Sequence, residues 1–358
     1  MSQRKWLENF KKGGEGREKI INSIGKTGIL LEHEALRIFE EMGFSSSFGY
    51  YEDEIENRKI TKEIDIVAHS KQKEIKVQKI TYYFNWKIIA DCKKEENRSI
   101  LIFEMPRKGE NTILHFPLLT RGHAYLDLGG IIPLEKFIKV FNMPMITTKI
   151  SDLKDCDDGK LERLQKKDEV ESRIYRTCEV QLLPATVHYY LNDKRFSDRE
   201  YANSWKKYFQ KDFEELHKLS AKNGKVLNTI DLFHQLSKKI PINSIDIFLF
   251  SDITIPMIIV DKHTALMKVD VDGKTHQVKD INEIGYFVYL YSPSTSEKFS
   301  ILGRFNELPI IICNIEKLSE CVKNLTNGIE LLLDEMQKNL NVNSNLFFEE
   351  MKRWRDGQ

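Results

Sequence analysis

Hydrophobic residues recur every three or four positions over residues 29–43. This spacing predicts an amphipathic helix, with Gly43 standing where a helix commonly ends. After this stretch, shorter segments rich in β-branched and aromatic residues predict strands. The expected strands are 60–68, 74–84, 86–92, 99–105 and 112–119. A mixed sheet flanked by helices is therefore expected in this part of the chain.

The pattern becomes helical from about residue 151 to 240, where Pro184 is expected to split or kink a candidate helix over 168–191. Strands then return, and the expected elements are strands near 245–250, 256–261, 264–271, 284–291 and 308–314 and a helix near 316–338. A chain of 358 residues is long enough for more than one core. We predict an α/β protein with a first domain over 1–150, a helical segment over 151–240 and a second α/β domain over 241–358.

The predicted strand that ends near residue 93 carries charges directly after an apolar run. Side chains alternate between the two faces of a strand. One face is expected to hold Lys87, Ile89, Asp91 and Lys93, and the other Trp86, Ile88, Ala90 and Cys92. A carboxylate can bind a hard divalent cation, and an ammonium can face a water or a phosphate oxygen. An Asp-x-Lys sequence is also common where a strand simply ends in solvated charges.

Two further acids precede this strand. Asp65 lies between Ile64 and Ile66, in a β-branched setting where an acid is disfavoured unless something binds it. The alternative is an aspartate at the edge of a sheet. Glu32 lies at the inner border of the first helix, whereas the outer face holds His33, Glu34, Arg37, Glu40 and Glu41. The alternative for Glu32 is a border glutamate that reaches out to solvent.

In this order, a helix with an inward glutamate, an Ile-Asp-Ile strand and an apolar strand ending in Asp-x-Lys resemble the PD-(D/E)xK nuclease superfamily, most closely its Mrr-like restriction endonucleases. The resemblance rests on "GILLEHEALRIFEEMGF", "EIDIVA" and "IIADCKK". It implies a restriction-endonuclease-like fold in which Glu32 is the helical acid, Asp65 and Asp91 are metal ligands and Lys93 is the motif lysine. Mrr-like members usually have a proline before the first aspartate, and this chain has none. The segment between the two aspartates is longer than in such members, and we expect it to form an extra β-hairpin.

The resemblance also implies a chemistry, which is Mg²⁺-dependent hydrolysis of phosphodiesters with Mn²⁺ as a substitute. Asp65, Asp91 and the backbone carbonyl of Cys92 would hold the metal, and Lys93 would orient or help deprotonate the attacking water. The Cys92 thiol is expected to fill the core. The expected function is a DNA endonuclease of a restriction or antiphage-defence type. The alternatives are a catalytically silent nuclease-fold protein that binds nucleic acid or acts as a sensor, and an RNase of the same fold.

Charge and composition restrict where the chain could bind nucleic acid. Lys and Arg total 55 against 54 Asp and Glu, so a nucleic-acid surface must be a local patch. Candidate phosphate contacts are Lys94 and, in an aromatic-rich helix, Lys206, Lys207 and Lys211. The alternative for that helix is an amphipathic element that buries its aromatic residues.

Five cysteines without a Cys-x-x-Cys pair, and no apolar leader or span, predict a soluble cytoplasmic protein without a membrane partner. The sequence leaves two possibilities open, which are a homo-oligomer and a partner protein from a defence system.

Overall fold

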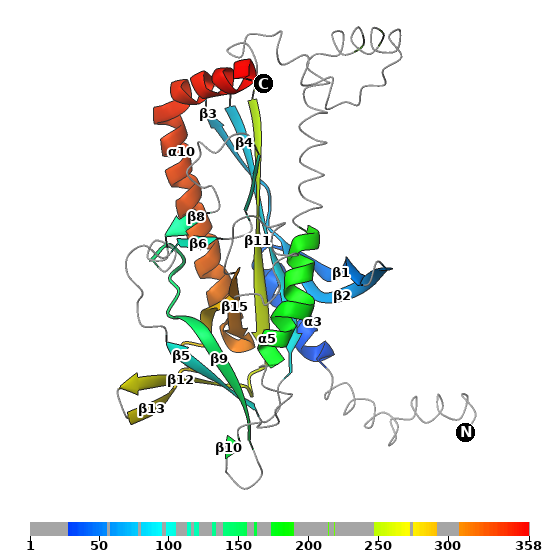
Figure 1. The fold of residues 1–358 in the computed structure, drawn as a ribbon, viewed down its shortest axis with the longest axis vertical. Helices are drawn as coiled ribbons and strands as arrows, with labels where there is room; N and C mark the ends of the chain where they lie inside the picture. The colour runs from blue at the N-terminus through cyan, green and yellow to red at the C-terminus, as the bar shows by residue number, and fades with distance from the viewer. Residues whose placement is uncertain are drawn as a thin grey trace, which may run out of the picture.

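The structure is a computed structural model. It describes residues 28–55, 58–77, 80–94, 98–104, 113–115, 118–121, 131–133, 139–155, 161–162, 173–189, 214, 218, 247–272, 275–291 and 308–357. Within these residues the chain is a mixed α/β protein whose sheet contains both parallel and antiparallel strands (Figure 1). The predicted α/β class is therefore confirmed in this coarse form.

The first half of the chain begins, within the described residues, with a helix followed by strands. These elements are helix α3 (Ile29–Glu41) and strands β1 (Ser45–Ile55), β2 (Arg58–His69), β3 (Lys73–Val77), β4 (Ile80–Lys93), β5 (Arg98–Glu104), β6 (Ile113–His115), β7 (Leu118–Arg121), β8 (Ile131–Pro133), β9 (Ile146–Asp155) and β10 (Leu161–Glu162). The predicted first helix is confirmed, and Gly43 follows it with a φ of 85°. Only glycine adopts this left-handed conformation at little cost, which explains the residue type at this helix end.

The second half contains helical elements on either side of further strands. These are α5 (Arg173–Thr177), the π-helical turn η1 (Cys178–Leu182), β11 (Ile247–Val260), β12 (Ala265–Asp272), β13 (Thr275–Asp280), β14 (Tyr286–Tyr291), β15 (Leu308–Asn314), the 3-10 turn η3 (Ile315–Lys317) and α10 (Leu318–Gly357). Residues 183–189 continue η1 as an α-helix. The predicted helical region starts later than expected, because β9 extends to Asp155 by pairing with β5 and β10.

The described strands form one 13-stranded sheet and a separate pair of β6 with β8. The main path runs β1-β2-β4-β11-β15-β14-β9-β5-β12-β13, with β3 on β4, β7 on β11 and β10 on β9. β3 pairs antiparallel with β4, which confirms the extra hairpin expected between the two aspartates. β4 lies beside β11 in parallel register along its whole length, from Ile80 to Lys93.

Strand β11 is a single element where the sequence predicts two. Pro256 lies within it, and proline cannot donate a hydrogen bond to a sheet. On the edge away from β4, β11 pairs with β7 up to Ile253 and with β15 from Met257. Pro256 therefore falls between these two partners, where a missing N–H costs no ladder hydrogen bond.

Two hydrophobic clusters cover the two faces of the sheet. One contains residues of α3 and α10 together with Trp86, Ile88, Ala90 and Cys92 of β4. The other contains Ile89 of the same strand together with residues of α5, η1 and the helix after it. Figure 1 shows α10 and the helical segment labelled α5 on either side of the long strands β4 and β11. The sheet is thus a central layer with helices on both faces.

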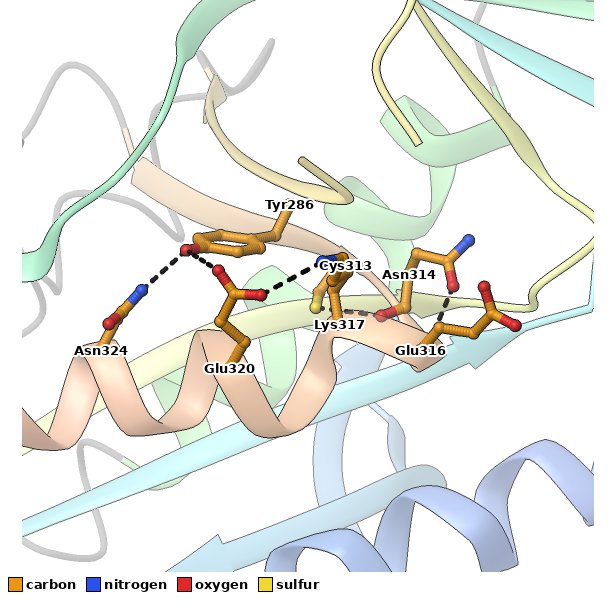
Figure 2. A network of polar contacts seen from close by, with 7 residues as sticks. All are labelled: Tyr286, Cys313, Asn314, Glu316, Lys317, Glu320 and Asn324. Carbon is orange, nitrogen blue, oxygen red and sulfur yellow. Dashed lines mark hydrogen bonds and ion pairs between the residues drawn. The ribbon is translucent and has the colours of Figure 1, made fainter. Parts of the chain in front are cut away.

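A polar network fixes the beginning of α10 on the sheet (Figure 2). Asn324 donates to the hydroxyl of Tyr286 at 2.7 Å, and that hydroxyl donates to Glu320 at 3.4 Å. The side chain of Asn314 accepts from the N–H of Glu316 and so caps η3. Because Tyr286 belongs to β14 and Asn314 ends β15, these bonds attach the helix to two strands of the sheet.

The predicted division into domains at residues 150 and 240 stays a prediction. The structure shows that β11, from the third predicted segment, lies beside β4 of the first in one sheet. Among the described helices, none is long and apolar enough to cross a membrane.

Candidate active site

Asp91 and Lys93 lie together at the C-terminal end of β4. Their side chains share the face of Ile89, as alternation along the strand predicts, because Cys92 and Ala90 belong to the cluster on the opposite face. The Asp91 side chain is 1% exposed and the Lys93 side chain 16% exposed. Nζ of Lys93 lies 2.6 Å from Oδ2 of Asp91. The Asp91 carboxylate is therefore buried and forms an ion pair with the less buried Lys93.

Asp65 reaches the same site from β2 through a β-bulge. Ser47 of β1 faces Val67 and Gly49 faces Ile64, so one residue of β1 stands opposite two residues of β2, one of which is Asp65. A bulge redirects side chains at the point where it interrupts the ladder. Ile64 accordingly belongs to one hydrophobic cluster and Ile66 to the other, although the two have the same parity along the strand.

A hydrogen bond connects Asp65 to the end of β4. The N–H of Cys92 donates to Oδ2 of Asp65 at 2.6 Å. The ladder between β2 and β4 runs only to Ile66 and Ala90, so the carboxylate takes the place of the next backbone acceptor. Successive residues of a strand direct their backbone groups toward opposite neighbouring strands. The carbonyl of Lys93 accepts from the N–H of Asp261, on the β11 side of β4. The carbonyl of Cys92 therefore lies on the opposite edge, which faces Asp65.

Glu32 approaches from α3, the helix layer on the Cys92 face. Its side chain is half-buried, whereas its neighbours His33 and Glu34 are exposed, which confirms the predicted phase of this helix. Burial raises the pKa of Glu32, and the charge of Asp65 raises that pKa further. Lys93 lowers the pKa of Glu32, and the charge of Glu32 in turn raises the pKa of Asp91. Glu32 therefore interacts electrostatically with Asp65, Asp91 and Lys93.

The pKa values of the two aspartates, Asp65 and Asp91, are both raised. Burial raises the pKa of Asp91 to about 7, against the attraction of Lys93, and the charge of Asp65 adds to the increase. Burial also raises the pKa of Asp65, while the hydrogen bond from the Cys92 N–H lowers it. Both increases have the sign expected for buried carboxylates, because burial disfavours the charged form.

The donor set fits a hard divalent cation. Among the described residues, both carboxylate oxygens of Asp91 are buried without an aligned hydrogen-bond donor, although Lys93 lies against one of them. No three His, Cys, Asp or Glu side chains in the described part of the chain form a ready metal-binding group. Mg²⁺ commonly uses only one or two carboxylates and keeps several waters. Asp65, Asp91 and the Cys92 carbonyl could therefore supply its protein ligands, with the Cys92 thiol packed away in the core.

The structure adds Gln181, a residue that the sequence did not single out. Its Oε1 accepts a hydrogen bond from Nζ of Lys93 at 3.1 Å, across a sequence separation of 88 residues. Neither a motif nor a helical period connects the two positions, so only the fold brings them together. Lys94 directly follows β4 and is half-buried. Lys206, Lys207 and Lys211 lie outside the described residues.

Comparison with protein-family models, with curated proteins and with solved structures finds no match to this chain.

Proposed function

We propose that this protein is a metal-dependent phosphodiester hydrolase, and specifically a DNA endonuclease of the PD-(D/E)xK type. The observation that carries the proposal is the meeting of Asp65, Asp91 and Lys93 at the end of one sheet, with Asp91 buried and its two oxygens without an aligned donor. A buried carboxylate without such donors is costly unless it has a further partner, and a cation would supply one.

Each residue has a distinct task in this proposal. Asp65, Asp91 and the Cys92 carbonyl would hold Mg²⁺, and Glu32 would act from outside this set by accepting a hydrogen bond from a water. A bound Mg²⁺ would supply positive charge that offsets the phosphate and would lower the pKa of a water below its bulk value. Lys93 orients the attacking water and stabilises the negative charge that develops on the phosphate. The proposal includes a restriction-endonuclease-like fold and a role in restriction or antiphage defence, which follow from the resemblance. It also includes a cytoplasmic location, which follows from the cysteine pattern of the sequence.

Cleavage of plasmid DNA tests the proposal directly. We expect cleavage with Mg²⁺ or Mn²⁺, none in excess EDTA, and binding with little turnover in Ca²⁺, whose looser coordination positions a water poorly. Asp65→Asn should abolish cleavage, because it removes a formal charge from the metal site. Full activity in EDTA would exclude the metal mechanism, and full activity of Asp65→Asn would place the site elsewhere in the chain.

Lys93 separates an enzyme from a silent nucleic-acid-binding protein. For an enzyme, Lys93→Ala should lower the rate on the order of 100-fold, while DNA affinity changes little because one phosphate contact among many is lost. Lys94→Ala is the control, since it removes the same charge one residue further along. If neither variant nor the wild type cuts DNA but all bind it equally, the silent binding protein is the better description. Cleavage of RNA in place of DNA would select the RNase.

A further inference from the structure

The ammonium of Lys93 contacts acceptors from two layers of the fold. Within the sheet, Nζ lies 2.6 Å from Oδ2 of Asp91. From the helix layer on that face, Oε1 of Gln181 accepts from the same nitrogen at 3.1 Å. An ammonium has three hydrogens and four rotatable bonds behind it, so it is a mobile group unless acceptors restrict it. The two contacts together restrict where the third hydrogen can point.

Gln181 occupies a π-helical turn that has an identifiable cause. Proline lacks an N–H and its ring clashes with the carbonyl four residues earlier, so Pro184 disfavours a regular α-helical turn over Val180. The N–H of Leu183 instead bonds to the carbonyl of Cys178, five residues earlier, which is the π-helical pattern. The wider turn sets the direction of every side chain within it, including that of Gln181.

This segment is attached to the sheet on both sides of Gln181. The Val180 carbonyl, which proline leaves without its helical donor, accepts from the hydroxyl of Tyr51 at 3.2 Å. Further along, the hydroxyl of Tyr189 donates to the carbonyl of Tyr50 at 3.3 Å. Both strand residues belong to β1. Gln181 is therefore presented to Lys93 by a fixed backbone, with one anchor immediately before it and another at the end of the helix.

We propose that Gln181, held in place by the π turn at Pro184, is a positioning residue for Lys93 in catalysis. This inference rests on the proposed nuclease function. When Asp91 serves a cation, Lys93 has to share that carboxylate. The amide oxygen of Gln181 then keeps the ammonium beside the site by accepting a hydrogen bond from it.

The chemical type of the residue fits this role. An amide oxygen accepts a hydrogen bond without neutralising the ammonium, so Lys93 keeps its full charge for the phosphate. A glutamate at the same place would keep the contact but would add a negative charge near the two aspartates. A leucine of similar size would remove the acceptor altogether. A comparison of glutamine, glutamate and leucine at position 181 therefore separates the effect of the hydrogen bond from the effect of an added charge.

The experiment uses the full chain with Gln181→Leu, Gln181→Glu and, as a control on the same segment, the exposed Arg176→Leu. In single-turnover cleavage with Mg²⁺ we expect Gln181→Leu to be slower by about 10-fold with DNA affinity changed by less than about 2-fold, because the contact acts on the transition state. Gln181→Glu should recover part of the rate. Arg176→Leu should behave as wild type.

Two further readouts exclude a merely structural effect. In a Lys93→Ala background, Gln181→Leu should cause no additional loss, since the partner through which it acts is gone. In the protein without added metal, acetic anhydride should modify Lys93 several-fold faster in Gln181→Leu than in wild type, measured by mass spectrometry against Lys94. Pro184→Ala, which permits a regular helical turn, should reproduce both the slower cleavage and the faster modification.

The outcomes are distinct. Unchanged cleavage and unchanged modification of Lys93 in Gln181→Leu would overturn the inference, as would an equal loss of rate in the Lys93→Ala background. Wild-type behaviour of Pro184→Ala would overturn the role of the π turn. If the wild-type chain cleaves nothing with any cation, the nuclease proposal and the catalytic role fall together, whereas faster modification of Lys93 would still establish the contact.

Discussion

Asp91 lies at the end of β4 with a pKa near 7, so its charge changes within the ordinary working range of a protein. An aspartate in an unfolded chain has a pKa of about 3.9. The folded protein therefore binds a proton at Asp91 that the unfolded chain releases. The stability that this proton contributes is present in full below about pH 4 and is lost as the pH rises to about 7.

The resulting prediction concerns the protein in EDTA. The free energy of unfolding should fall between pH 5 and pH 8 by an amount on the order of 2 kcal/mol attributable to Asp91, and Asp91→Asn should remove that part of the decrease. Denaturant titrations of both proteins at the two pH values measure it. Burial also raises the pKa of Asp65 and of Glu32, so the variant keeps a smaller slope of the same sign. An identical slope in the two proteins would contradict the shift at Asp91.

Residues of the candidate site differ in how far the sequence could predict them. Alternation along a strand predicts the shared face of Asp91 and Lys93, and helical spacing predicts the inner border position of Glu32. An acid between two isoleucines marks Asp65 as unusual, but the bulge that turns it toward the site depends on the pairing of β1 with β2. Gln181 could not be predicted, because a contact between a strand and a helix 88 residues away leaves no spacing in the sequence.

The bulge between β1 and β2 is the element on which the position of Asp65 depends. Gly49 lies opposite it, where an added Cβ would lie 2.7 Å from Cγ2 of Ile64 and 2.8 Å from the hydroxyl of Tyr189, and closer still to Val67. Real Cβ atoms do not approach other atoms so closely. A side chain at this position would therefore push β1 away from the bulge.

Gly49→Ala should accordingly lower the free energy of unfolding by about 1–3 kcal/mol, typical of an overpacked site, and should also reduce cleavage by moving Asp65. The control is Gly43→Ala, where no atom lies within 4 Å of an added Cβ and the cost comes from the positive φ instead. Gly43→Ala should lose stability but keep its cleavage rate under conditions where it is folded. Equal cleavage by both variants would mean that the bulge does not control the site.

Elements with a strong hydrophobic periodicity lie where the sequence predicts them, and the elements that differ from the prediction do so for specific reasons. The helix Ile29–Glu41 is confirmed because its apolar stripe is regular. The strand Ser45–Ile55 was not predicted, since its serines and acids give no clear alternation and its pairing with β2 supplies the stabilisation. Pro256 suggests a break in β11, but the strand continues because its two partners on that edge meet there.

At the scale of the whole molecule, β4 and β11 connect parts of the chain that are far apart in sequence. They pair from Ile80 with Ile247 to Lys93 with Val260. A second connection runs from the end of β15, where Asn314 donates to the carbonyl of Asp261, whose own N–H bonds to the carbonyl of Lys93. The strand that carries the candidate catalytic residues is thus supported by the C-terminal part of the sheet.

This support predicts the behaviour of a fragment that contains residues 1–150. Without β11, the fragment exposes a long edge of β4 with unpaired backbone groups, and such edges promote aggregation. We expect it to be insoluble or to lack a cooperative unfolding transition, as measured by size-exclusion chromatography and circular dichroism. A soluble fragment that unfolds cooperatively and binds Mn²⁺ would instead support the division into separate domains.

The same pairing determines when the site can form during protein synthesis. About 150 residues separate the end of β4 from the start of β11. At translation rates of about 5–20 residues per second, the ribosome needs on the order of ten seconds to cover this distance. During that interval the nascent chain holds Asp65, Asp91 and Lys93 but not the strand that aligns the last two. A chain whose translation stops early therefore carries the candidate catalytic residues without the partner strand that supports them.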